Sequence, residues 1–277
     1  GRQLKIGLGV LSRSAFDAGV RSSPYTPDIT FSHFLPLYLT PDHGQRALRA
    51  TQLTLRVLSG PNQPRNWSWR FAARALPRCL RSLAVAFFTG DTHASESCLV
   101  EFLGIARWLV HFADTSPQLA ADLDSRVSSF VRSAKGRSRS AVPDLGDFVC
   151  YMLAARSLDL SAVIPALVRE VLARNVRWAK GAKDPTHVFD ACKVSFRTVA
   201  FLVSGLLFTL VPFPAQQLDS RAGSPLASQL AGLQQSAKEC AKISSFREWY
   251  ESLRLRAPER MDLEWDRAVR ESQRTAS

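Results

Sequence analysis

The chain has 277 residues, of which 46% are hydrophobic and 22% are charged. These proportions exclude collagen-like, disulfide-framework and porin-like proteins, and they indicate a globular chain with one large or two small domains. The formal net charge is +12. Most of it lies early, because residues 1–60 carry 7 basic and 3 acidic side chains and residues 61–140 carry 11 and 6. A basic half can meet phosphate, although arginine on solvated helix faces is the simpler explanation.

Helical periodicity predicts an all-α fold of about ten helices. Residues 1–24 are predicted to be a basic N-terminal tail or linker, with the end of a transit peptide as the alternative. Residues 25–277 form the predicted helical domain, which is either one compact unit or two apposed halves, 25–135 and 141–277.

The first predicted helix begins at Thr40-Pro41 and runs to Gly60. Pro77 interrupts the next apolar segment, 67–88, which predicts two helices or one kinked helix. A helix carrying Leu99 begins at Asp91 or Thr92, and another runs from Pro117 to Gly136.

Residues 160–176 have the clearest amphipathic pattern, with apolar residues on one face and a second face predicted to meet water. The solvent-facing residues in this prediction are Arg169, Glu170, Arg174 and Arg177. Pro143 and Pro185 mark two further helix starts.

The segment 186–211 starts amphipathic and becomes apolar on all sides, so we expect a buried central helix there. The uncharged run 198–215 reaches Pro212 after about 14 residues, which is short of the ~20 that a bilayer requires. Helices near 225–243, around Trp249 and around Trp265 complete the fold. The steps Leu35-Pro36 and Leu76-Pro77 lie 41 residues apart, which raises the hypothesis of a HEAT-like bundle.

The cysteines are scattered, and no two have the Cys-x-x-Cys spacing of a zinc or redox site. Five cysteines among apolar neighbours are typical of buried reduced thiols. We therefore expect an intracellular, reducing compartment, the cytoplasm or nucleus, with an organelle as the alternative. No metal and no cofactor are predicted.

Three polar groups could carry chemistry, and each has a structural alternative that we favour. The first group is His93, Glu96 and Cys98. As chemistry it would be a Cys-His pair or half a metal site, and as structure it is the start of a helix. Asp144 and Asp147 are either paired carboxylates or first-turn acids after Pro143. Asp190, Lys193 and Arg197 form either a salt-bridged strip or an anion site.

Basic residues supply the remaining candidates. Arg174 has the spacing to stack on Trp178, although core packing of the tryptophan is the ordinary explanation. The arginine- and serine-rich run 132–141 is a predicted break that acts either as a plain connector or as a phosphorylation-sensitive loop. Candidate contacts for an anion or a partner are Arg46, Arg49, Arg56, Arg65, Arg70, Arg74, Arg78, Arg81, Lys193 and Arg197.

Several short runs occur together in one order: FSHFLPLY at 31–38, PDHG at 41–44, VPDLGDF at 142–148, RNVRW at 174–178 and ACKVSFR at 191–197. In this order, across roughly residues 25–255, the chain resembles an uncharacterised helical region of large multidomain proteins of protists and fungi. The resemblance implies neighbours of ubiquitin-conjugating or RING type. The chain itself lacks the His-Pro-Asn triplet of a ubiquitin-conjugating domain and the ligand set of a RING.

The function we expect is therefore a non-catalytic helical scaffold or protein-interaction module, linked through the resemblance to ubiquitin transfer. Protein partners are expected, and the sequence leaves the oligomeric state open. One alternative is a basic helical subunit that contacts RNA or a ribonucleoprotein, with the arginines of residues 46–81 gathered on one face. A second alternative is a hydrolase or transferase built on His93 or on a buried carboxylate.

Overall fold

The computed structural model describes residues 69–90, 96–176, 179, 185–208 and 227–274, together with Gly19. These residues form ten α-helices and one π-helical segment, with no strand among them. The predicted all-α class is confirmed. The predicted helix from Thr40 to Gly60 and, apart from Gly19, the tail 1–24 lie outside the described residues.

The first part of the described fold consists of α3 (Trp69–Thr89), α4 (Glu96–Thr115), α5 (Pro117–Arg132) and the short α6 (Ala134–Arg137). The helix α3 packs against α4, α7 and α9 and runs unbroken through Pro77. The segment predicted to be two helices or one kinked helix therefore forms one helix in its described part.

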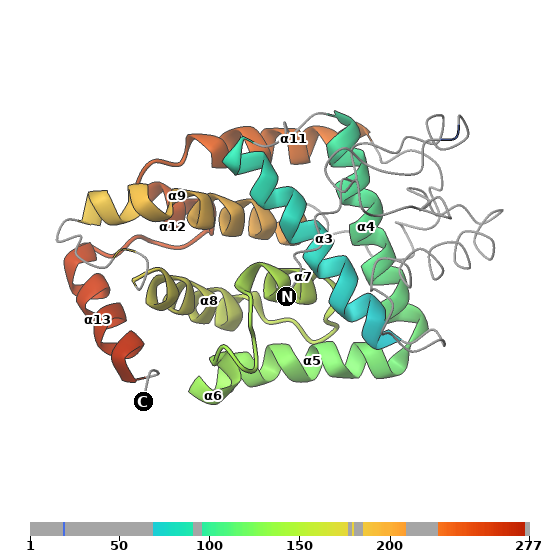
Figure 1. Cartoon of the computed structure of the whole chain (residues 1–277), viewed down its shortest axis with the longest axis horizontal. Coiled ribbons are helices and arrows are strands. Elements are labelled where there is room, and N and C mark those ends of the chain that lie inside the picture. Colours follow the sequence, from blue (N-terminus) through green and yellow to red (C-terminus); the bar gives the residue numbers. More distant parts are fainter. Residues whose placement is uncertain are drawn as a thin grey trace.

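The remaining helices are α7 (Leu145–Ala154), α8 (Leu160–Asn175), α9 (Pro185–Phe201), α11 (Ala227–Lys242), α12 (Phe246–Ser252) and α13 (Met261–Arg274). In Figure 1, α5 lies along one edge of the domain and α11 along the opposite edge, with α8 and α9 between them. The helix α13 closes one end, where it packs against α8 and α9.

The centre of the fold is shared by α7 and by α9 with its π-helical continuation, η3 (Leu202–Phe208). Every residue from Val199 to Val203 is buried, as are Phe148, Val149 and Cys150 of α7. The predicted buried helix near 186–211 is thus present, but it changes from α- to π-helical hydrogen bonding at Leu202. Residues 209–215 of the uncharged run 198–215 lie outside the described part of the chain.

One helix ends earlier than predicted. The helix predicted for 117–136 ends at Arg132, because Ser133 adopts an extended conformation and ends α5 while capping α6. Its hydroxyl accepts a hydrogen bond from the Gly136 amide at 3.0 Å, so the chain turns back instead of continuing.

One hydrophobic cluster joins buried residues from α3 through α13. The division into halves at residue 140 stays a prediction, and so does the HEAT-like arrangement. None of the described helices is long and apolar enough to cross a membrane.

Candidate interaction surface

Two arginines of α3 meet the start of α7 in a partly buried charge cluster. The Arg81 guanidinium lies 3.0 Å from Asp144 and 3.0 Å from Asp147, and Arg78 lies 3.9 Å from Asp147. Glycine at position 146 leaves room for the Arg81 side chain, because a Cβ at this position would lie 2.7 Å from it. The cluster fastens α3 to α7 across more than sixty residues of chain.

Asp144 is the N-cap of α7 and accepts hydrogen bonds from the amides of Gly146 and Asp147. This supports the helix-start interpretation of the two carboxylates. Burial, together with the nearby Asp144 charge, raises the pKa of Asp147 to about 6, against the opposing effect of Arg81 and Arg78.

The thiols beside this cluster have no thiolate character at neutral pH. Burial, with the charge of Asp147, raises the pKa of Cys79 to about 12 and raises that of Cys150 well above its usual value. A nucleophilic cysteine requires a depressed pKa. The cluster is therefore suited to joining helices, and its one group that titrates near neutral pH is Asp147.

The predicted strip on α9 divides into one structural residue and two exposed ones. Arg197 donates from Nε to the carbonyl oxygen of Ile243 at 2.9 Å, just after the end of α11. Asp190 and Lys193 are exposed. Arg197 thus ties α9 to the end of α11, and Lys193 remains available to solvent.

The predicted arginine face of residues 46–81 falls mostly outside the described residues, which include none of Arg46, Arg49, Arg56 and Arg65. Arg70 lies in the first turn of α3, and Arg74 and Arg78 are exposed on that helix. Whether the whole set gathers on one face stays a prediction. Arg81, by contrast, is occupied by Asp144 and Asp147.

Basic side chains also gather in residues 132–143, which we call the basic segment. It contains four basic side chains and no acidic one. Arg132, Lys135 and Arg139 are exposed, whereas Arg137 turns back and donates to the carbonyl oxygens of Phe130 at 2.9 Å and Val131 at 3.3 Å. The stretch predicted to be a break is thus an ordered turn that follows the end of α5.

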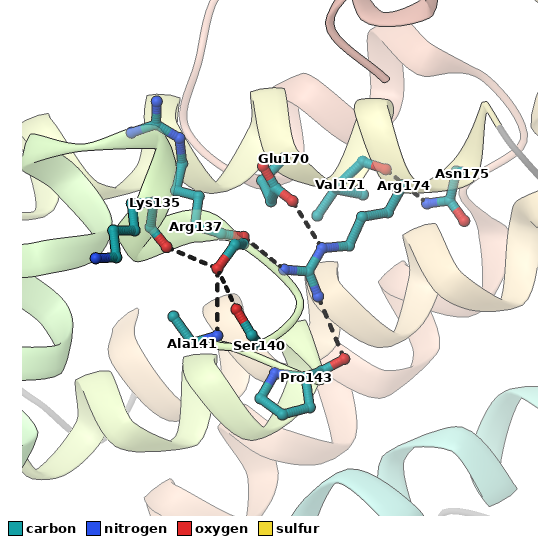
Figure 2. A network of polar contacts seen from close by, with 10 residues as sticks. Lys135, Arg137, Ser140, Ala141, Pro143, Glu170, Val171, Arg174 and Asn175 are labelled. Carbon is teal, nitrogen blue, oxygen red and sulfur yellow. Dashed lines mark hydrogen bonds and ion pairs between the residues drawn. The ribbon is translucent and has the colours of Figure 1, made fainter. Parts of the chain in front are cut away.

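Arg174 of α8 holds both ends of the C-terminal half of this segment, residues 137–143 (Figure 2). Its guanidinium donates to the carbonyl oxygen of Arg137 at 2.9 Å and to that of Pro143 at 3.3 Å. Glu170 orients the guanidinium with an ion pair of 2.8 Å. We refer to these contacts as the Arg174 clamp.

The Arg174 clamp corrects one prediction. The face of α8 that carries Glu170 and Arg174 was predicted to meet water, but the Arg174 side chain is only 12% exposed because the basic segment covers it. Arg169 is exposed as predicted. Stacking of Arg174 on Trp178 stays a prediction, because Trp178 is outside the described residues.

Sequence reasoning missed two further polar contacts. Asn175 is buried and donates to Val171 at 3.0 Å and to Ser195 of α9 at 3.1 Å. Ser204 of η3 lies 2.5 Å from Ser236 of α11. The visible signals were an asparagine at a position of the apolar face of α8, four residues after Val171, and a serine within the apolar run 198–211.

Of the polar run around His93, only Cys98 has a described side chain, and it is buried. Among the described residues, no group of three potential metal ligands comes together. No protein-family model matches the chain, and no significant match was found among curated proteins or solved structures.

Proposed function

We propose that this chain is a non-catalytic α-helical protein-interaction module and that the basic segment is the surface by which it binds an acidic partner. The observation that carries the proposal is the Arg174 clamp. A nearly buried guanidinium holds a turn that carries the exposed Arg139, and the exposed Arg132 and Lys135 lie a few residues before that turn. Burying an arginine is costly unless its donors are satisfied, and here they are used to fix a solvent-facing loop.

The setting we propose for this module is an assembly with ubiquitin-conjugating or RING-like subunits. Its support is the order of short motifs between residues 31 and 197, and two of these motifs contribute to the Arg174 clamp. Pro143 belongs to the run 142–148, and Arg174 opens the run 174–178.

Contact with RNA is the second candidate function. It is favoured by the exposed Arg74 and Arg78 on α3, together with the basic segment. Binding to phosphates would weaken steeply with salt, because each neutralised phosphate releases counterions. Hydrolase or transferase activity has less support, since Asp147 is paired with Arg81.

The proposal is tested by affinity capture of tagged protein at about 50 and about 200 mM salt, with and without nuclease. Three forms are compared: the unchanged chain, Lys135→Glu/Arg139→Glu, and the control Lys238→Glu/Lys242→Glu. The control makes the same change of charge on exposed residues of α11, at the opposite edge of the domain.

We expect one set of proteins to be recovered with the unchanged chain and the control, regardless of nuclease, and to be lost with Lys135→Glu/Arg139→Glu. Recovery that disappears after nuclease treatment would favour RNA contact. Equal recovery by both variants would show that the basic segment is not the binding surface.

A further inference from the structure

We infer that Ser140 is a phosphorylation site for an arginine-directed protein kinase that uses ATP. The inference concerns modification of the basic segment, and it stands independently of any partner that this segment binds. Ser140 is exposed and follows Arg137 by three residues and Arg139 by one. Arginines at such positions are recognised by kinases whose substrate grooves carry carboxylates.

The Arg174 clamp presents Ser140 on a loop with a fixed base. The two carbonyl groups that Arg174 holds belong to Arg137 and Pro143, so residues 138–142 project between two anchored points. Within them, the backbone bonds of the turn are those from Ala141 and Val142 to the Ser138 carbonyl. A kinase needs an extended substrate strand, and opening this turn breaks few hydrogen bonds.

Among the residues that the structure describes, one other serine follows an arginine by three residues, and it provides an internal comparison. Ser129 is exposed and follows Arg126 by three residues, but both lie inside α5. Both arginines are held by the fold, Arg126 by Asp122 at 2.7 Å and Arg137 by the carbonyl oxygens of Phe130 and Val131. Either side chain must swing out to meet a kinase, so the difference between the two sites lies in the backbone. Modification of Ser129 requires unwinding of a packed helix. The fold therefore favours Ser140, although both serines have the same spacing from an arginine.

The reaction is an ordinary phosphoryl transfer. The Ser140 Oγ attacks the γ-phosphorus of ATP, the new O–P bond forms, and the bond from that phosphorus to the β–γ bridging oxygen breaks. ADP leaves, and the hydroxyl proton passes to the catalytic base of the kinase. The product carries a charge of about −1.5 to −2 at neutral pH, which cancels up to half of the charge of the basic segment.

The hydrogen bonds around Ser140 indicate how phosphorylation changes the loop. Ser138 donates its hydroxyl hydrogen to the Lys135 carbonyl at 2.7 Å, so in the 2.9 Å contact between the two serines Ser140 is the donor. Phosphorylation removes that hydrogen. The Ser138 hydroxyl is then expected to turn toward the phosphate, so the Lys135 carbonyl loses the hydroxyl hydrogen bond and keeps the one from the Ser138 backbone N–H at 3.1 Å. The turn that follows α6 is then held by one hydrogen bond fewer.

The test is phosphorylation of the folded 277-residue chain by the catalytic subunit of the cyclic-AMP-dependent protein kinase with ATP and Mg²⁺, with the site mapped by mass spectrometry. We expect phosphate at Ser140 at a rate at least tenfold above that at Ser129. Ser140→Ala should lose most of the incorporation and Ser129→Ala should retain it.

Both serines are exposed, so neither alanine variant should disturb folding, and circular dichroism checks this. Arg137→Lys keeps a donor for the α5 carbonyls and should slow the reaction severalfold. The inference is overturned if Ser140 remains unmodified in the folded chain, if Ser129 reacts as fast, or if Arg137→Lys leaves the rate unchanged.

Discussion

Gly136 is the residue on which the reversal between α5 and α6 depends. A Cβ at this position would overlap the carbonyl group of Ser129, and a backbone atom cannot move aside as the end of a flexible side chain can. Gly136→Ala should therefore destabilise the protein by about 2 kcal/mol and lower its thermal midpoint by roughly 5 °C. Circular dichroism measures this.

Gly90 supplies the comparison for that substitution. It has φ of +82°, but a Cβ there would have no atom within 4 Å. Gly90→Ala therefore costs only the left-handed backbone strain, about 1 kcal/mol. Equal midpoints for the two variants would contradict the close contact between Gly136 and Ser129.

Asp147 should make stability depend on pH in a direction opposite to that of an ordinary ion-paired carboxylate. Its pKa rises from 3.8 to about 6 on folding, chiefly through burial, so between these values the native state binds more protons than the unfolded state. The stability contributed by the protonated group is present below about pH 4 and is lost as the pH rises to about 6. At ~1.36 kcal/mol per pKa unit, the change is about 3 kcal/mol.

Asp147→Asn tests this effect, because asparagine stays neutral. Urea unfolding at pH 4 and pH 7 should show the variant gaining stability relative to the unchanged chain as the pH rises. Asp144→Asn keeps an N-cap residue but removes the charge beside Asp147. The pKa of Asp147 should then fall, and the stability of this variant should change less between pH 4 and pH 7. Parallel pH curves for Asp147→Asn and the unchanged chain would refute the raised pKa.

At the scale of elements, the Arg174 clamp should determine how firmly the basic segment is held on α8. Arg174→Lys keeps the charge but replaces a forked donor with a single ammonium group, which cannot reach Glu170, Arg137 and Pro143 together. Amide exchange at Ala141 and Val142 should accelerate at least tenfold, equivalent to about 1.4 kcal/mol of local stability.

Arg169→Lys is the matched control for the clamp, since it makes the same chemical change at an exposed position of the same helix. Its exchange pattern should equal that of the unchanged chain. If Arg174→Lys has no effect, or if both variants accelerate exchange alike, the clamp does not hold the segment.

Helices could be predicted from sequence wherever one face alone is apolar. The pattern of α8 places Val163, Leu167 and Val171 in the core, where they are buried. A break at 132–141 could be predicted from the arginine- and serine-rich run, but the reversal at Ser133 could not, because it depends on how closely Gly136 approaches Ser129. The π-helical hydrogen bonding at Leu202 was equally hidden, since the segment is apolar on all sides and has no periodicity to interpret.

The candidate site was less predictable than the helices, because its contacts join residues far apart in the chain. Arg81 was recognised as a basic candidate, but its pairing with Asp144 spans 63 residues. The pair of Glu170 and Arg174 was visible at helical spacing, yet only the fold shows that another segment covers it. The charge pattern of a sequence identifies these charged residues, but it does not show which of them are exposed to solvent in the fold.

At the scale of the whole molecule, the five cysteines report whether the domain unfolds as one unit. All five are buried thiols. Cys79 and Cys98 lie on α3 and α4, within the predicted half 25–135, and Cys150, Cys192 and Cys240 lie on α7, α9 and α11, within the half 141–277. One hydrophobic cluster contains residues of both groups, which favours a single cooperative unit.

Alkylation of the thiols across a urea series distinguishes one cooperative unit from two. Burial raises the pKa of Cys79 to about 12 and that of Cys240 to about 11, so these buried thiols react only after the chain around them opens. We expect all five peptides to become labelled at one urea midpoint within error, since α3 and α7 share the core and the Arg81 ion pairs. Labelling of Cys79 and Cys98 at one midpoint and of the other three at another would establish two halves.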